Sequence, residues 1–276
     1  MRPLHITSIL ITLTFVGHGG ASELRTTLGL AMSTQQRAEI LHERFLENRR
    51  SRFDQLRNPY KSPKAARVVE ELPAPWKSNL YPWHPRVTAT VFWVGELPTQ
   101  NNPTPNTASS WDQNWVASYG GYDHPTKRNG YFPAGFIPKQ CPFYVALPYN
   151  DISSNGYHKP EAKDLIPWYW RDYRGPSLSV CHERWIAIHY KGAVCYAQWR
   201  DVGPFRTDDG EYVFNGKKPQ PNRNKNAGID VSPAVRDFLK LPGNVRVDWR
   251  FVENYEVQAG PWQGWVEEAP LPTAHR

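Results

Sequence analysis

The sequence has few of the residues that usually bind metal ions. Cysteine occurs only three times in 276 residues, and the nine histidines are scattered. The sequence contains no His-x-x-x-His pair and no Cys-x-x-Cys pair, so the ligand spacings typical of zinc sites are absent. We therefore expect neither a bound metal nor a cofactor.

The sequence also lacks an apolar run that is long enough to span a bilayer. Its N-terminal run, Ile6 to Val16, is too short for a membrane helix. Arg2 and His5 precede this run and Gly19-Gly20-Ala21 follow it. A charged start, a short apolar core and small residues are typical of a secretory signal peptide, which we place at residues 1–21. We expect a secreted or periplasmic protein with no integral membrane segment after cleavage.

A basic excess is missing from most of the chain. Residues 1–66 hold 10 Lys and Arg against 5 Asp and Glu, whereas residues 67–276 hold 23 against 21. The formal net charge of +7 therefore belongs mainly to the N-terminal part. A body that binds nucleic acid normally carries a basic face of its own, so we do not expect a nucleic-acid partner.

Export permits disulfide bonds, but three cysteines leave at least one thiol outside any internal bridge. Cys181 and Cys195 flank a hairpin-like stretch and are the candidate pair. A turn near Gly192 would place Cys195 opposite Ile188, so a Cys181–Cys195 disulfide requires Cys181 to fold back across the strand. The spacing leaves the paired and unpaired forms open, together with the fate of Cys141.

What the sequence has in abundance is proline and aromatic residues: 26 Pro, 12 Trp and 14 Tyr. This composition favours a loop-rich, mostly β protein. Residues 87–94, 143–147, 185–190, 194–199 and 245–251 are predicted strands, and Ser232-Pro233 predicts the start of a short helix that runs to Leu239. We expect a basic helical arm at 22–57, a proline-rich linker at 58–85, a β domain at 86–256 and a C-terminal tail at 257–276.

Two acidic motifs carry a family resemblance. Asp201-Val-Gly-Pro-Phe205, followed by Gly228-Ile-Asp-Val-Ser232 and its short helix, resembles the double-psi β-barrel of the rare lipoprotein A-like family. Ala146-Leu147-Pro148 is similar to the Leu-Pro of that family, and residues 87–96 are similar to its first strand. The resemblance covers residues 86–252, with large insertions.

The resemblance implies a six-stranded double-psi β-barrel that acts on, or binds, a cell-wall polysaccharide. Expansins, barwin-like domains, family-45 endoglucanases and the membrane-bound lytic transglycosylase A barrel share this architecture. One position departs from the pattern, because Tyr144 stands where the lytic members carry a histidine. Tyrosine is a poor proton shuttle near neutral pH, and this departure favours a non-hydrolytic, expansin-like role as the alternative.

The two aspartates suit glycoside cleavage, which needs a carboxyl group to protonate the leaving oxygen and often a second carboxylate. Asp201, at the end of a strand, is the first candidate for the general acid or base, and Asp230 is the second; Tyr144 completes the candidate set. Each aspartate also has a structural interpretation, as a turn cap for Asp201 and as a partner of the helix dipole for Asp230. If Asp201 is an acid, burial near Trp199 and Phe205 must raise its pKa.

Aromatic side chains provide the candidate glycan-binding surface, because flat rings stack on sugars. The candidates are Trp168, Tyr169, Trp170, Trp199 and Phe205. The segment 120–123, near Trp111 and Trp115, could form a further edge of a groove. Each of these aromatics has packing in the core as its alternative. A structural or protein-inhibiting barrel, with no glycan affinity, is the third class of function.

Overall fold

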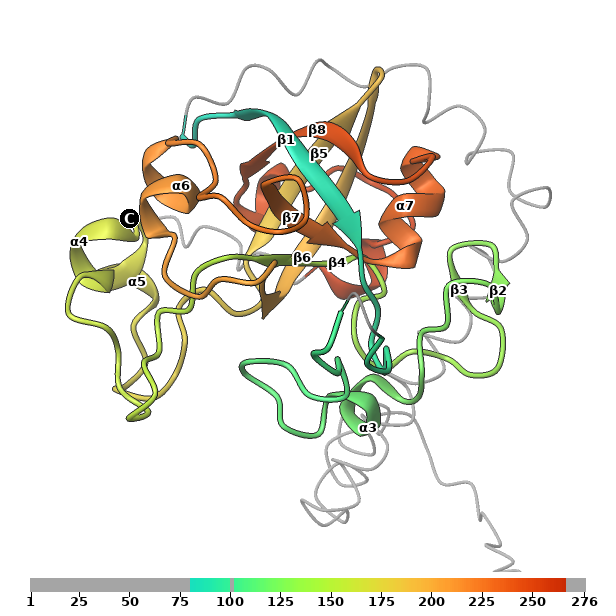
Figure 1. Ribbon diagram of the computed structural model, residues 1–276, viewed down its shortest axis with the longest axis horizontal. Helices are drawn as coiled ribbons and strands as arrows, with labels where there is room; N and C mark the ends of the chain where they lie inside the picture. Colours follow the sequence, from blue (N-terminus) through green and yellow to red (C-terminus); the bar gives the residue numbers. More distant parts are fainter. Residues whose placement is uncertain (1–79, 100–101, 267–276) are drawn as a thin grey trace, which may run out of the picture. The chain divides into compact units, whose positions relative to one another are not determined.

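The computed structural model describes residues 80–99 and 102–266 (Figure 1). The predicted signal peptide, the helical arm, most of the proline-rich linker and the end of the C-terminal tail lie outside these residues. Within them, no helix combines the length and the apolar character needed to cross a lipid bilayer.

Six strands form a closed barrel. Around the barrel, their order is β1-β7-β4-β6-β5-β8. Two neighbouring pairs are parallel, β1 with β7 and β4 with β6, and the other four are antiparallel. The strands are β1 (His84–Val91), β4 (Tyr144–Leu147), β5 (Trp185–Tyr190), β6 (Ala193–Val202), β7 (Ala227–Val231) and β8 (Val245–Phe251). The expected six-stranded β-barrel is thus confirmed.

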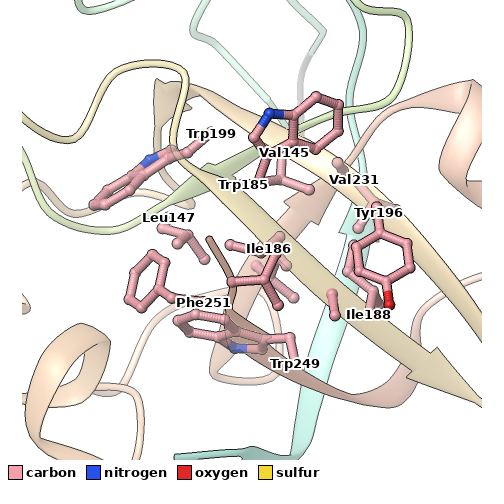
Figure 2. Close-up of a cluster of buried hydrophobic side chains, with 14 of the residues drawn as sticks. Val145, Leu147, Trp185, Ile186, Ile188, Tyr196, Trp199, Val231, Trp249 and Phe251 are labelled. Carbon is pink, nitrogen blue, oxygen red and sulfur yellow. The ribbon is translucent and has the colours of Figure 1, made fainter. Parts of the chain in front are cut away.

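The strands close into a barrel because their apolar side chains fill its interior. Figure 2 shows this core, in which Trp199 and Trp249 are fully buried among aliphatic residues from β4, β5 and β7. The residues of β4 alternate between two apolar clusters. Val145 and Leu147 belong to the barrel core, whereas Tyr144 and Ala146 belong to a second cluster with the segment after β1. The central strand β4 is therefore covered on both faces.

The covering of the second face comes from the long segment between β1 and β4. It contains α3 (Trp115–Tyr119) and a small hairpin of β2 (Arg128–Asn129) and β3 (Phe132–Pro133). Phe92, Val94, Trp115 and Tyr119 pack against β4. The resemblance came with large insertions, and the structure shows that this one is wrapped on the barrel.

The remaining helices lie around the rim of the barrel (Figure 1). Ser232 caps α7 through its hydroxyl, which accepts a hydrogen bond from the N–H of Val235 (3.3 Å), as the Ser-Pro start predicted. In the view of Figure 1, α4 and α5 lie on the side of the barrel opposite the β2–β3 hairpin. The helices are α4 (Ala162–Leu165), α5 (Tyr169–Asp172), α6 (Gly210–Asn215), α7 (Pro233–Leu239) and the 3₁₀ turns η3 (Asn254–Glu256) and η4 (Gln263–Trp265).

The expected Cys181–Cys195 disulfide is wrong. All three cysteines are buried free thiols. Cys195 lies opposite Ile188 in the β5–β6 ladder, as a turn near Gly192 requires, and Cys181 lies before β5 and does not fold back onto Cys195. Of the two arrangements that the spacing left open, the structure has the unpaired one.

Candidate active site

Two of the predicted site residues meet at one place on the barrel. Asp201 of β6 and Asp230 of β7 are both register partners of Ala146, which lies between them on β4. Asp230 is in turn the register partner of Thr90 on β1. Side chains of register partners point to the same face of a sheet, so these four residues form one row across four strands. The two aspartates therefore lie in one row, with Ala146 between them.

This row lies on the outer face of the barrel, beneath the wrapped insertion. Ala146 belongs to the cluster that packs against the insertion, and not to the barrel core. Neighbouring strands are about 4.8 Å apart, so the Cα atoms of Asp201 and Asp230 are about 10 Å apart across Ala146. The insertion reaches the row directly, because the N–H of Ser110 donates to Asp201.

Asp201 is held by backbone groups. Its Oδ1 accepts hydrogen bonds from the N–H groups of Ser110 (2.8 Å) and Val202 (2.7 Å). Only 8% of its surface is exposed. Burial raises the pKa of Asp201 from 3.8 to about 6, although the hydrogen bonds from Ser110 and Val202 act to lower it. This is the shift that a general acid or base at Asp201 requires.

Asp230 has a still higher proton affinity. Burial raises its pKa from 3.8 to about 7, while the hydrogen bond from the Thr90 hydroxyl lowers it and the charges of Asp201 and Glu96 raise it further. The turn after β6 lies against this carboxyl, since a Cβ atom at Gly203 would be 3.6 Å from Oδ2 of Asp230. Near neutral pH, Asp230 therefore holds a proton more readily than Asp201 does.

A third carboxyl, that of Glu96, interacts electrostatically with Asp230. It is buried, and burial raises its pKa although the amide of Asn106 donates to Oε2 (2.8 Å). Its charge contributes to the raised pKa of Asp230. Sequence reasoning placed Glu96 at the end of a strand and assigned it no role. The sequence signal that could have identified it is an acidic residue that directly follows a predicted strand and a glycine and precedes a long insertion.

The structure places Tyr144 away from any open surface. Its hydroxyl donates to Oδ2 of Asp123 (2.9 Å) and accepts the N–H of Val94 (2.9 Å). Asp123 in turn forms a buried ion pair with Arg128. Burial raises the pKa of Tyr144 well above its usual value. Tyr144 thus ties β4 to the segment that carries Glu96, and a proton exchange between its hydroxyl and a substrate has no path in this arrangement.

The predicted aromatic surface is mostly core. Trp168, Tyr169 and Trp199 are buried, so their rings offer no open face to a ligand. The indole N–H of Trp168 donates to the carbonyl of Val180 (2.7 Å), which satisfies the only polar group of that side chain. Trp170, on α5, is 73% exposed and Phe205, two residues after Gly203, is 52% exposed. Of the five candidates, only these two can contact a sugar.

Two hollows lie in the wrapped insertion. The first has a volume of about 530 Å³ and the second about 490 Å³, and Tyr122 lines both of them. Gly95 and Leu97, the neighbours of Glu96 in sequence, line the first. Asp201 and Asp230 line neither hollow. Gly120 and Gly121 line the second hollow, and Trp93 and Phe136, which sequence reasoning missed, line the first; Asp123 is buried and lines neither.

No metal centre accompanies these residues. Within 80–99 and 102–266, no group of three or more His, Cys, Asp or Glu side chains is arranged to hold a metal ion.

Comparison with known proteins adds little to this geometry. No family model matches the chain, and no curated protein matches it. Among solved structures, a Streptomyces papain inhibitor (SPI) is similar with 16% sequence identity over 61% of this chain and 93% of that chain, at a TM-score of 0.24. A likeness at that TM-score carries no argument about fold or function.

Proposed function

We propose that this chain is an exported protein that cleaves a cell-wall glycan, peptidoglycan or a related polymer, at the Asp201–Asp230 pair. The observation that carries the proposal is the row in which two carboxyls with raised pKa, the buried Asp201 and the half-buried Asp230, flank one alanine on the outer face of the barrel. The signal-peptide pattern of residues 1–21 supports export. The two parallel strand pairs, β1 with β7 and β4 with β6, support a double-psi barrel of the rare lipoprotein A-like type.

The pKa order assigns a role to each aspartate. Asp230, with the higher pKa of about 7, is the general acid that donates a proton to the glycosidic oxygen as the C–O bond breaks. Asp201, with a pKa of about 6, is ionised first and accepts a proton from the attacking water as the new C–O bond forms. This exchanges the roles expected from the sequence, in which Asp201 was the first candidate for the acid. The main cause of the raised pKa of Asp230 is burial, and the charges of Asp201 and Glu96 raise it further.

The separation of the two strands supports a direct attack by water. Cα atoms about 10 Å apart leave room for side chains whose carboxyls lie farther apart than the roughly 5 Å of a double-displacement enzyme. A hydrolytic product carries one more water than the anhydro product of a lytic transglycosylase. Mass spectrometry of the products therefore separates the two reaction types.

The experiment is digestion of purified wall glycan by the wild type, Asp201→Asn and Asp230→Asn. We expect each variant to lose at least about a hundredfold in product release, because general acid–base catalysis contributes that much. Asp208→Asn is the matched control, since Asp208 pairs with Arg206 at the surface. Thermal denaturation of each variant shows that it is folded. Equal release from all four proteins, or none from the wild type, contradicts the proposal.

A second candidate function is glycan binding without cleavage, as in expansins. One observation favours it: Oδ1 of Asp201 already accepts two backbone hydrogen bonds, which is also the arrangement of a structural carboxylate. This candidate predicts that wild type, Asp201→Asn and Asp230→Asn bind wall glycan equally and that none releases product.

A further inference from the structure

The first hollow in the insertion has two aromatic walls, and each wall rests on a glycine. A Cβ atom at Gly95 would lie 2.1 Å from Cδ1 of Tyr122, and one at Gly121 would lie 2.7 Å from Cε1 of Phe136. Both glycines also have positive φ, of +82° and +150°. Any other residue at either position would displace the ring and strain the backbone. Glycine at these two positions therefore leaves room for the rings of Tyr122 and Phe136.

These rings face a cavity of ligand size. The hollow of about 530 Å³ lies within the range of roughly 300–1,000 Å³ that is typical of small-molecule sites. Trp93 supplies a third aromatic side chain, and its ring centroid is 6.5 Å from that of His124. Tyr122 is 56% exposed although its ring rests on Gly95, so its other face is open. Flat, open aromatic faces suit the stacking of sugar rings.

The ionisable side chains that line the hollow are all basic. Its lining, which lies entirely within the described residues, contains Lys127 and His124 and no Asp or Glu. Nδ1 of His124 is the partner of the N–H (3.2 Å) and the hydroxyl (3.0 Å) of Thr126. In the neutral ring, an Nδ1 that accepts the backbone N–H leaves the proton on Nε2, which is then a donor. The second hollow, across Tyr122, likewise contains one lysine, Lys139, and no acid.

The hollow adjoins the proposed reaction centre through three consecutive residues. Gly95 and Leu97 line the hollow, and Glu96 lies between them in the sequence. The charge of Glu96 acts on Asp230 of the proposed reaction centre. The N–H of Gly95 donates to the carbonyl of Asn106 (2.7 Å), which fixes this short segment. A polymer whose scissile bond lies at the carboxyls can therefore place a neighbouring sugar in the hollow.

We propose that the hollow is a subsite for a sugar that bears a carboxylate, within the glycan substrate. The sugar ring stacks on Tyr122 and Trp93, its carboxylate meets the ammonium group of Lys127, and Nε2–H of His124 donates to a hydroxyl or acyl oxygen. That this sugar is part of a substrate which is cleaved rests on the proposed function. Its binding in the hollow does not depend on cleavage. A single-stranded nucleic acid also stacks on aromatic rings, so its binding is one of the outcomes that the test distinguishes.

Calorimetric binding in the Asp201→Asn background tests this subsite without cleavage. The ligands are peptide-free glycan strands of peptidoglycan, which carry a lactyl carboxylate on alternate sugars, the same strands after methyl esterification, and a thymidine oligonucleotide. We expect the carboxylated strands to bind best. Lys127→Gln weakens their binding about threefold, as for an exposed ion pair, and leaves the esterified strands unaffected. Tyr122→Ala weakens both about tenfold through loss of stacking.

Matched substitutions elsewhere serve as controls. Lys218→Gln removes an exposed lysine near α6, and Tyr255→Ala removes an exposed ring on η3; both should bind as the background protein does. Gly95→Ala should displace Tyr122 and weaken binding about as much as Tyr122→Ala does. Gly130→Ala is its control, because Gly130 also has positive φ (+59°) but a Cβ atom there meets nothing within 4 Å.

The outcomes separate this proposal from the proposed function. Unchanged binding in Lys127→Gln and Tyr122→Ala, equal binding of the esterified strands, tighter binding of the oligonucleotide, or no binding at all would each overturn the subsite. If cleavage by the wild type then still depends on Asp201 and Asp230, the proposed function stands alone. If binding follows the expected pattern but the wild type releases no product, the subsite stands and cleavage is excluded.

Discussion

Asp201 and Asp230 lie opposite each other across a single residue, because each is the register partner of Ala146 from a different edge of β4. The two residues are 29 positions apart in the sequence and are brought together by the parallel β4–β6 pairing and the antiparallel β4–β7 pairing. Burial raises the pKa of Asp201 to about 6 and that of Asp230 to about 7, and the charges of Asp201 and Glu96 raise the latter further, so the two carboxyls titrate in succession near neutral pH. This relationship underlies the first two predictions.

The rate of glycan cleavage should have a bell-shaped dependence on pH. Asp201 must be ionised and Asp230 protonated, so activity rises through about pH 6 and falls through about pH 7. Initial rates measured from pH 4 to 9 check this, with kcat/KM as the readout. Residual activity in Asp230→Asn should lose the alkaline limb and that in Asp201→Asn the acidic limb. A flat profile in the wild type would exclude this pair as the acid and base.

Replacement of Asp201 by asparagine should change how stability depends on pH. The pKa of Asp201 is raised on folding, from 3.8 to about 6, so its favourable contribution is complete below pH 3.8 and is lost as the pH rises through 6. Relative to the wild type, Asp201→Asn should therefore gain roughly 3 kcal/mol of unfolding free energy between about pH 4 and pH 7. Urea unfolding at several pH values measures the difference. A constant difference would show that this carboxyl is not desolvated.

Replacement of Tyr144 by phenylalanine should affect stability more than chemistry. The change removes the hydroxyl that joins Asp123 to the N–H of Val94 and leaves both groups buried without that partner. We expect a loss of about 1–3 kcal/mol in unfolding free energy, with both limbs of the pH–rate profile kept. Denaturant unfolding and the rate profile are measured on the same variant. Loss of one limb would instead give Tyr144 a direct role in proton transfer.

The two tryptophans around Tyr169 should respond differently to truncation. Trp168 is buried against the barrel core and the Arg184 guanidinium lies 4.1 Å from its ring centroid, so Trp168→Ala should cost about 3–5 kcal/mol of stability. Trp170 is exposed, and Trp170→Ala should change stability by no more than about 0.5 kcal/mol. Denaturant unfolding of both variants provides the comparison. Similar losses in both would contradict the burial of Trp168.

The free thiols should be inaccessible in the folded protein. All three are buried, and burial raises the pKa of Cys141 to about 12, so little thiolate is present at pH 8. A chromogenic disulfide reagent should detect no reactive thiol in the native protein and three in guanidinium chloride. Detection of only one thiol after denaturation without a reductant would show that two are bridged.

Much of the barrel could be predicted from local patterns. The β-branched and aromatic runs located five of the six strands, and Val245, Val247, Trp249 and Phe251 alternated as a half-buried strand should. The Ser232-Pro233 pair located the start of α7. These predictions succeeded because strand alternation and helix caps depend on neighbours within a few residues.

The candidate site could be predicted only in part. Motif order and the resemblance selected Asp201 and Asp230, but not the order of their pKa values, because the pKa of Asp230 depends on burial and on the charges of Asp201 and Glu96, which lie in other segments of the chain. The aromatic candidates failed for a related reason. Trp168 and Trp170 are two residues apart on one helical turn, and only the packing of that turn decides which ring is buried.

The amino-acid sequence alone determined that residues 86–256 are mostly β, where the main turns and caps lie, and which two acidic motifs could carry chemistry, since each of these follows from short-range preferences. Only the tertiary structure decided that β4 separates the two aspartates, that Tyr122 and Phe136 rest on glycines, and that the cysteines are unpaired. Register between strands, desolvation and close packing join residues that are far apart in the chain. These long-range interactions therefore cannot be predicted from local sequence patterns.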